Sequence, residues 1–175
     1  MCIRDRGWTD DHLHSFFIHG REYRVHHVGG LSFPDDPTHV RLADFRFRLR
    51  ERFLYTYDFG DHWVHEVRLE KVLPIEEQCT YPLCIGGARA CPPEDCGGPW
   101  SFLALRDHFW LGYTIDRTLE LLKAIMQQHG KLEEEERGEL RQLLYWLHAH
   151  RFHRYPVNRR LQWYATDDPR WRDMI

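Results

Sequence analysis

The segment from residue 53 to residue 73, FLYTYDFGDHWVHEVRLEKVL, contains the strongest local pattern in the chain. Side chains that alternate with a period of two lie on opposite faces of a β-strand. Such an alternation runs into residues 58–62, where Gly60 allows a turn, and continues after them. The pattern predicts an antiparallel β-hairpin with one largely aromatic face, formed by Phe53, Tyr55, Tyr57, Trp63, His65, Val67 and Leu69.

Two further strands are expected before the hairpin. The segment His14–His19, HSFFIH, ends at Gly20 and predicts a strand, and a loop follows it through Gly29, Gly30, Pro34 and Pro37. In residues 45–50, Phe45, Phe47 and Leu49 alternate with Arg46, Arg48 and Arg50. The three guanidiniums could form a binding stripe. A solvated sheet face is the favoured reading, because charged outer faces are ordinary in antiparallel sheets.

Helical periodicity replaces the alternation after residue 100. One helix is expected to start at a Thr114 cap and to end near Gly130, and a second to run from Glu133 to Arg154. Pro156 then interrupts, before a short helix over 157–165. The buried faces are expected to be Leu119, Leu122, Ile125 and Met126 in the first helix, and Leu140, Leu143, Leu144 and Leu147 in the second. Strands followed by helices predict an α+β fold, an antiparallel sheet built around the aromatic hairpin with the C-terminal helices packed on it.

Composition sets outer limits on function. The chain has 175 residues, of which 42% are hydrophobic and 14% aromatic, enough for the core of one domain. The net charge of −3 lacks the general excess of positive charge that is typical of nucleic-acid binders. No apolar stretch is long enough to cross a membrane and no signal region follows Met1, so we expect a cytoplasmic protein.

A loop rich in proline and glycine, YPLCIGGARACPPEDCGGPW, occupies residues 81–100. Its composition rules out regular structure, yet its apolar residues predict that it is held in one conformation. We expect the hairpin and this loop to form a single unit, and any activity to lie where they meet.

Two stretches resemble the plasmid pRiA4b ORF-3-like domain family: YTYDFGDHWVHEVRLEKVLP at residues 55–74 and YPLCIGGARACPPEDCGGPWSF at residues 81–102. The segments 7–23, GWTDDHLHSFFIHGREY, and 157–161, VNRRL, fit the same family. The resemblance implies a compact α+β domain. It implies no settled activity, although family members include passenger proteins of bacterial insertion elements.

The N-terminus departs from that family. Members usually begin with a strand and a helix, including a Pro-Pro-Ile-Trp-Arg-Arg-like stretch, ahead of the segment that here starts at Gly7. Residues 1–6, MCIRDR, match nothing in the pattern and suggest an unrelated leader or an artefact. We therefore expect a single, N-terminally truncated domain over residues 7–175, which would self-associate through an exposed sheet edge.

The cysteines suggest a structural zinc site. Four of the five lie close together in the sequence, at Cys79, Cys84, Cys91 and Cys96, and His65 is an alternative fourth ligand. Their spacings of four, six and four intervening residues differ from the paired two-residue spacing of common zinc ribbons. Small buried cysteines of the core are the favoured reading.

A carboxylate and imidazole cluster is the second metal hypothesis. Asp58, Asp61, His65, Glu94 and Asp95 could bind a metal and support hydrolase-like chemistry if the hairpin turn meets the loop. The favoured alternative is that the turn aspartates accept backbone N–H bonds and that Glu94 and Asp95 cap the loop.

The C-terminal end is locally basic. Nucleic acid could be contacted there by Arg151, Arg154, Arg159 and Arg160, with Trp163 stacking on a base. The alternative is a helix that packs its aromatic side chains on the core and exposes its arginines to solvent. Our first hypothesis is a non-catalytic interaction domain of mobile-element origin whose partner is DNA or another mobile-element protein. The alternatives are a metal-dependent hydrolase-like enzyme and a structural zinc-binding domain.

Overall fold

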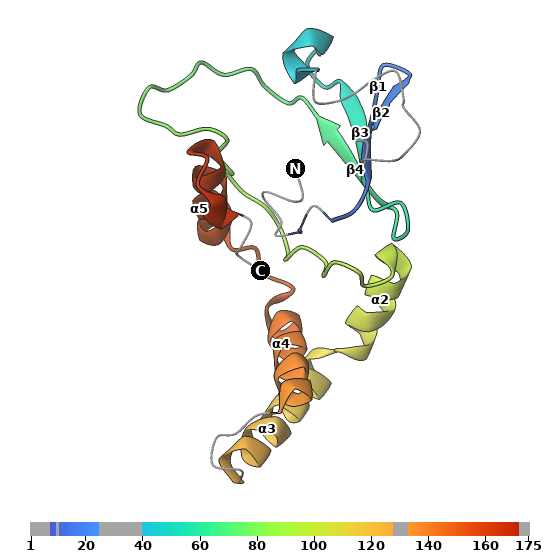
Figure 1. Ribbon diagram of the computed structural model, residues 1–175, viewed down its shortest axis with the longest axis vertical. Helices are drawn as coiled ribbons and strands as arrows, with labels where there is room; N and C mark the ends of the chain where they lie inside the picture. The colour runs from blue at the N-terminus through green and yellow to red at the C-terminus, as the bar shows by residue number, and fades with distance from the viewer. Residues whose placement is uncertain (1–7, 10, 25–39, 128–132, 172–175) are drawn as a thin grey trace. The chain divides into compact units, whose positions relative to one another are not determined.

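Residues 8–9, 11–24, 40–127 and 133–171 are described by the computed structural model of the chain (Figure 1). Contacts between residues divide the chain into two compact units. The sheet unit holds residues 9–80 and 97–99, and the helical unit holds residues 1–8, 81–96 and 100–175. Residues 1–6, the predicted loop with Gly29, Gly30, Pro34 and Pro37, and the predicted helix stop at Gly130 lie outside the described residues.

The sheet unit contains a four-stranded antiparallel sheet (Figure 1). Its strands are β1 (His14–Ile18), β2 (Arg21–Arg24), β3 (Arg52–Tyr57) and β4 (Trp63–Arg68), in the order β2-β1-β3-β4. The predicted hairpin is confirmed as β3 and β4, with Tyr55 opposite His65. The predicted first strand is confirmed as β1, and β2 follows it through the turn at Gly20.

One face of this sheet forms an aromatic core. Phe53, Tyr55 and Tyr57 are buried along β3, as their alternation predicts. The Phe16 ring of β1 lies 4.9 Å from the Tyr55 ring, so neighbouring strands stack their aromatic side chains. The opposite face leaves Phe17, Leu54 and Val64 exposed. The period-two pattern therefore determines which face of the hairpin is buried.

The strand predicted over residues 45–50 is wrong. A short 3-10 helix, Leu42–Phe45, is followed by an irregular segment in which Arg46 has φ 47° and Arg50 has φ 71°. These left-handed residues break an extended strand. The alternation of side chains persists nonetheless, because Phe45 and Phe47 are half-buried against the His19 ring while the arginines between and after them are exposed.

Four helices make up most of the helical unit: α2 (Gly98–His108, whose first two residues group with the sheet unit), α3 (Leu111–Gln127), α4 (Glu134–His148) and α5 (Arg154–Ala165). Together with the sheet they confirm the α+β class. A 3-10 helix, Pro169–Trp171, follows α5. The packing of these helices on the sheet and the single domain over 7–175 stay predictions.

Helix boundaries differ from those expected. Helix α3 begins three residues before Thr114, whose hydroxyl donates to the Phe109 carbonyl from inside the first turn. Helix α4 ends at His148, and α5 begins at Arg154. Pro156 lies in the first turn of α5, where its missing N–H removes no intrahelical bond. Helix α2 was not predicted.

Helices α3 and α4 pack side by side (Figure 1). Leu121 of α3 and Leu143 and Trp146 of α4 are buried, and the Arg117 guanidinium forms a two-point ion pair with Glu139, in which Nη2 lies 2.9 Å from Oε2. The predicted buried face of α3 is wrong, because Leu119, Leu122 and Met126 are exposed. In α4 Leu144 is exposed as well.

The proline- and glycine-rich loop is pinned by hydrogen bonds within the helical unit. The Asn158 side chain accepts from the Cys84 N–H at 2.7 Å and donates to the Cys84 carbonyl at 2.9 Å. Tyr145 and Trp8 donate to the carbonyls of Cys91 and Pro92. Because these partners belong to the helical unit, residues 81–96 group with it, and only residues 97–99 group with the sheet unit, in place of the single hairpin-loop unit that we expected.

No described helix combines the length and the apolar character that crossing a bilayer requires.

Candidate functional site

Residues 46–52 of the sheet unit, RFRLRER, carry four arginines and one glutamate, and we refer to them as the arginine loop. The loop is closed onto the strand end of β4 by two backbone hydrogen bonds. The Arg50 N–H donates to the Leu69 carbonyl at 2.7 Å, and the Leu69 N–H donates to the Glu51 carbonyl at 3.0 Å. These bonds hold the loop beside β4, although only its last residue, Arg52, belongs to a strand.

Two adjoining hollows lie along the arginine loop. The first has a volume of about 580 Å³ and the second about 430 Å³. Arg50 lines both of them, so the two form one continuous basic surface. The first is lined by His19, Phe45, Arg46, Arg48, Leu49, Arg50 and Glu51, and the second by Arg50, Arg52, Arg68 and Glu70.

The two acidic residues that line these hollows form hydrogen bonds or ion pairs within the protein. Glu51 Oε1 lies 2.6 Å from His19 Nε2, and Glu51 Oε2 accepts the Arg48 N–H at 2.6 Å. The Arg48 N–H, followed by the His19 side chain, lowers the pKa of the Glu51 carboxyl, which therefore stays ionised. Glu70 forms an ion pair with Arg68.

Three guanidiniums of the arginine loop have no such carboxylate. Within the described part of the chain, no carboxylate oxygen lies within 4.0 Å of the guanidinium nitrogens of Arg46, Arg48 or Arg50, and all three side chains are exposed. Arg52, by contrast, is paired with Glu66 at 3.0 Å. A guanidinium offers five N–H donors in a planar fork that matches phosphate or carboxylate oxygens. The hollows are therefore suited to an anionic partner.

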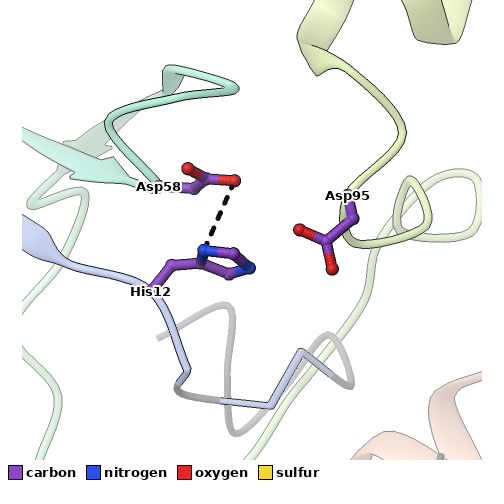
Figure 2. A group of neighbouring side chains, drawn as sticks. All are labelled: His12, Asp58 and Asp95. Carbon is purple, nitrogen blue, oxygen red and sulfur yellow. Dashed lines mark ion pairs between the residues drawn. The ribbon is translucent and has the colours of Figure 1, made fainter.

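The acidic residues of the hairpin turn have structural roles. Asp58 Oδ1 accepts the N–H groups of Gly60 at 2.9 Å and Asp61 at 3.2 Å, and Asp58 Oδ2 lies 3.8 Å from His12 Nδ1 (Figure 2). Asp61 Oδ2 accepts the Gly97 N–H at 3.0 Å. These bonds match the alternative in which both aspartates accept backbone N–H bonds.

The predicted carboxylate and imidazole cluster gains no support within the sheet unit. His65 Nδ1 lies 3.3 Å from the Tyr55 carbonyl in the aromatic sheet. Among the described residues, the ligand atoms of Asp58, Asp61 and His65 do not lie within 4.8 Å of one another. Glu94 and Asp95 belong to the helical unit.

The predicted thiolate site is likewise not assembled. In the helical unit, the sulfur atoms of Cys84, Cys91 and Cys96 do not all lie within 4.8 Å of one another. Cys84 Sγ donates to the Gly86 carbonyl at 3.3 Å. Cys79 belongs to the sheet unit, where its Sγ donates to Glu76. Zinc bound by thiolates needs Zn–S distances of about 2.3 Å, which three separated sulfurs cannot provide.

The basic C-terminal end, predicted to contact nucleic acid, makes some of its contacts within the protein itself. Arg160 is only 4% exposed, and its Nε donates to the Trp171 carbonyl at 2.6 Å, so the prediction that Arg160 contacts nucleic acid is wrong. The guanidiniums of Arg159 and Arg170 lie over the Trp163 ring, 4.8 and 4.9 Å from its centroid. Arg151 and Arg154 are exposed, at the turn before α5 and at its first residue.

We expect Arg160→Ala to lower the free energy of unfolding by about 1–3 kcal/mol, because it removes the buried hydrogen bond from Arg160 Nε to the Trp171 carbonyl. Urea denaturation followed by tryptophan fluorescence measures this change. Arg159→Ala is the matched control, and it should cost only about 0.5–1 kcal/mol through the lost contact with the Trp163 ring. Equal small effects of the two substitutions would contradict a structural role for Arg160.

Sequence reasoning found the three unpaired arginines but missed His19, Arg52 and Arg68 as their neighbours. His19 and Arg68 come from other parts of the chain, at the end of β1 and in β4. The only signal for Arg68 was its outward position in the predicted hairpin.

Comparisons with known proteins place the chain among relatives. The family described as Plasmid pRiA4b ORF-3-like protein matches residues 4–110, which confirms the resemblance inferred from the two motifs. The uncharacterized protein y4hQ of Sinorhizobium fredii is 34% identical over 104 residues, 55% of this chain and 50% of that protein. The chain thus spans about half the length of this curated relative.

A solved structure is similar over more of the chain. It is the crystal structure of a protein of unknown function, MM3350, from Methanosarcina mazei Go1. The similarity has a TM-score of 0.54 and 32% sequence identity, and it covers 88% of this chain and 77% of that one. It therefore extends into the C-terminal helices, beyond the family match.

Proposed function

We propose, from the premise that this chain belongs to the plasmid pRiA4b ORF-3-like protein family, that it is a non-catalytic interaction domain whose arginine loop binds the phosphate backbone of DNA. The observation that carries the proposal is the set of three exposed guanidiniums, Arg46, Arg48 and Arg50, which have no carboxylate partner among the described residues and lie along two adjoining hollows.

The local charge supports an anionic partner. The arginine loop carries a net charge of +3, although the whole chain carries −3. Glu51, the one acid of the loop, is held by His19 and by the Arg48 N–H, which limits its competition for the neighbouring guanidiniums. Guanidiniums bind phosphate oxygens in a two-point geometry, and their electrostatic attraction does not depend on base sequence.

The choice of DNA among anionic partners rests on analogy. The family description names a plasmid, which is a DNA molecule. The sequence resemblance also implies relatives among the passenger proteins of insertion elements. The negative charge of the remaining chain opposes association with DNA. We therefore expect weak binding, in the range of non-specific complexes, that is lost as salt is added.

The test is fluorescence anisotropy of a labelled 20-base-pair duplex titrated with the full chain at several salt concentrations. We expect the triple variant Arg46→Ala, Arg48→Ala, Arg50→Ala to bind at least tenfold more weakly at low salt. Each lost phosphate contact should reduce the slope of log K against log salt by about 0.9, because fewer counterions are released on binding.

A second triple variant provides the control for net charge. Arg89→Ala, Arg106→Ala and Arg141→Ala remove the same charge from exposed positions of the helical unit. This variant should keep the affinity of the unmodified chain within about threefold, because the proposal assigns the phosphate contacts to the arginine loop and not to net charge alone. If the unmodified chain does not bind the duplex, or if both triple variants lose affinity equally, the arginine loop is not a DNA-binding surface.

A further inference from the structure

Helix α3 exposes an apolar stripe along its length. Leu111, Ile115, Leu119, Leu122 and Met126 recur every three or four residues, which places them on one side of the helix, and we call them the α3 stripe. Their side chains are between 42% and 79% exposed. The stripe covers fifteen residue steps, or about 22 Å along the helix.

The opposite side of α3 already has a partner. Thr114 and Leu121 are buried, and the helix packs against α4. Arg117, on that side, is tied to Glu120 and Glu139. The α3 stripe is therefore a second apolar face, separate from the one that forms the α3–α4 contact. Contiguous exposed apolar faces of this kind mark interaction surfaces in soluble proteins.

The charged residues beside the α3 stripe indicate which partner would bind to it. Asp116 and Lys123 are both exposed and lie on the same flank of the α3 stripe, near its two ends. Within the described part of the chain, neither makes an ion pair, since the pairs of α3 involve Arg117 alone. The midpoint between Asp116 and Lys123 falls beside Leu119, which is also near the middle of the stripe. In an antiparallel pair of α3 helices, the negative charge of one copy would therefore face the positive charge of the other.

We propose that α3 binds α3 of a second copy of this chain, in an antiparallel pair around a two-fold axis near Leu119. A two-fold axis brings the same stripe from both copies together. It also places Asp116 of one copy beside Lys123 of the other, twice. A parallel pair around a two-fold axis would place this flank of the two copies on opposite sides of the interface, so Asp116 and Lys123 would not meet. This surface differs from the sheet edge through which the sequence predicts self-association.

The test is sedimentation velocity of the full chain over a range of concentrations. The unmodified chain dimerises reversibly, and Leu119→Glu weakens dimerisation at least tenfold, because it buries a carboxylate opposite its own copy. The control is Leu144→Glu, an exposed leucine of α4 outside the stripe, which leaves the dimer unchanged. Circular dichroism serves to check that both variants keep their helix content.

A charge exchange tests the orientation of the pair. Asp116→Lys or Lys123→Asp alone places like charges together and weakens dimerisation about tenfold, whereas the double variant restores it to within about threefold. A chain that stays monomeric at every concentration overturns the proposal. So does a dimer that Leu119→Glu leaves intact, because that dimer uses another surface such as the sheet edge. Failure of the double variant to restore dimerisation overturns the antiparallel arrangement.

Discussion

Leu143→Ala is expected to lower the free energy of unfolding of the helical unit by about 2–5 kcal/mol. The Leu143 side chain is 0% exposed in α4, on the helix that packs against α3. Truncation removes buried apolar surface and leaves a cavity that the neighbouring side chains fill only in part. Loss of this contact should loosen α3 and α4 together, since the two helices pack against each other.

Leu144→Ala is the matched control for this substitution. It makes the same chemical change one residue further along the same helix, at a side chain that is 44% exposed. We expect it to cost less than about 1.5 kcal/mol, because much of the side chain is in water already. Thermal unfolding by circular dichroism ranks the two variants, and hydrogen exchange locates the change in α3 and α4. Similar losses for both variants would show that Leu143 is not a central packing residue.

Gly98→Ala should cost the sheet unit about 2–5 kcal/mol of stability. Gly98 has φ +79°, in the left-handed region that favours glycine. A Cβ atom built at this position would overlap the Asp61 carbonyl oxygen, so the backbone of the hairpin turn would have to move. The neighbouring hydrogen bond from the Gly97 N–H to Asp61 Oδ2 should weaken as well. Conformational strain and steric overlap each contribute roughly 1–3 kcal/mol.

Gly20→Ala separates the two contributions. Gly20 also has a positive φ, +80°, but no atom lies within 4 Å of a Cβ built there. It should therefore show the conformational strain without the overlap, and urea unfolding should rank Gly98→Ala as the more destabilising of the two. Equal effects would mean that the hairpin turn accommodates the methyl group.

The arginine loop shows how far the candidate site could be predicted. The alternation of aromatic residues and arginines over residues 45–50 correctly indicated that the arginines point away from the aromatic side chains. It wrongly predicted an extended strand, because Arg46 and Arg50 adopt positive φ angles, which the residue types do not reveal. The hollows also depend on Arg68 of β4, which the turn and the strand register bring beside the loop.

The basic C-terminal end shows what the sequence could not predict. Arg159 and Arg160 are adjacent and chemically identical in the sequence, yet one lies over the Trp163 ring and the other is buried against the Trp171 carbonyl. Neighbouring residues of a helix point about 100° apart, so only the packing of the following turn decides which of them is buried. A cluster of basic residues in sequence is therefore weaker evidence for a binding surface than unpaired charges along a hollow.

Local periodicity determined the class of this protein, because a period of two in β3 and a period of three to four in the helices are encoded residue by residue. The motifs of residues 55–102 determined its family. The tertiary structure alone decided which charges and which apolar faces are left without a partner. The unpaired arginines and the exposed α3 stripe depend on contacts between residues far apart in the chain, and no local pattern specifies those contacts.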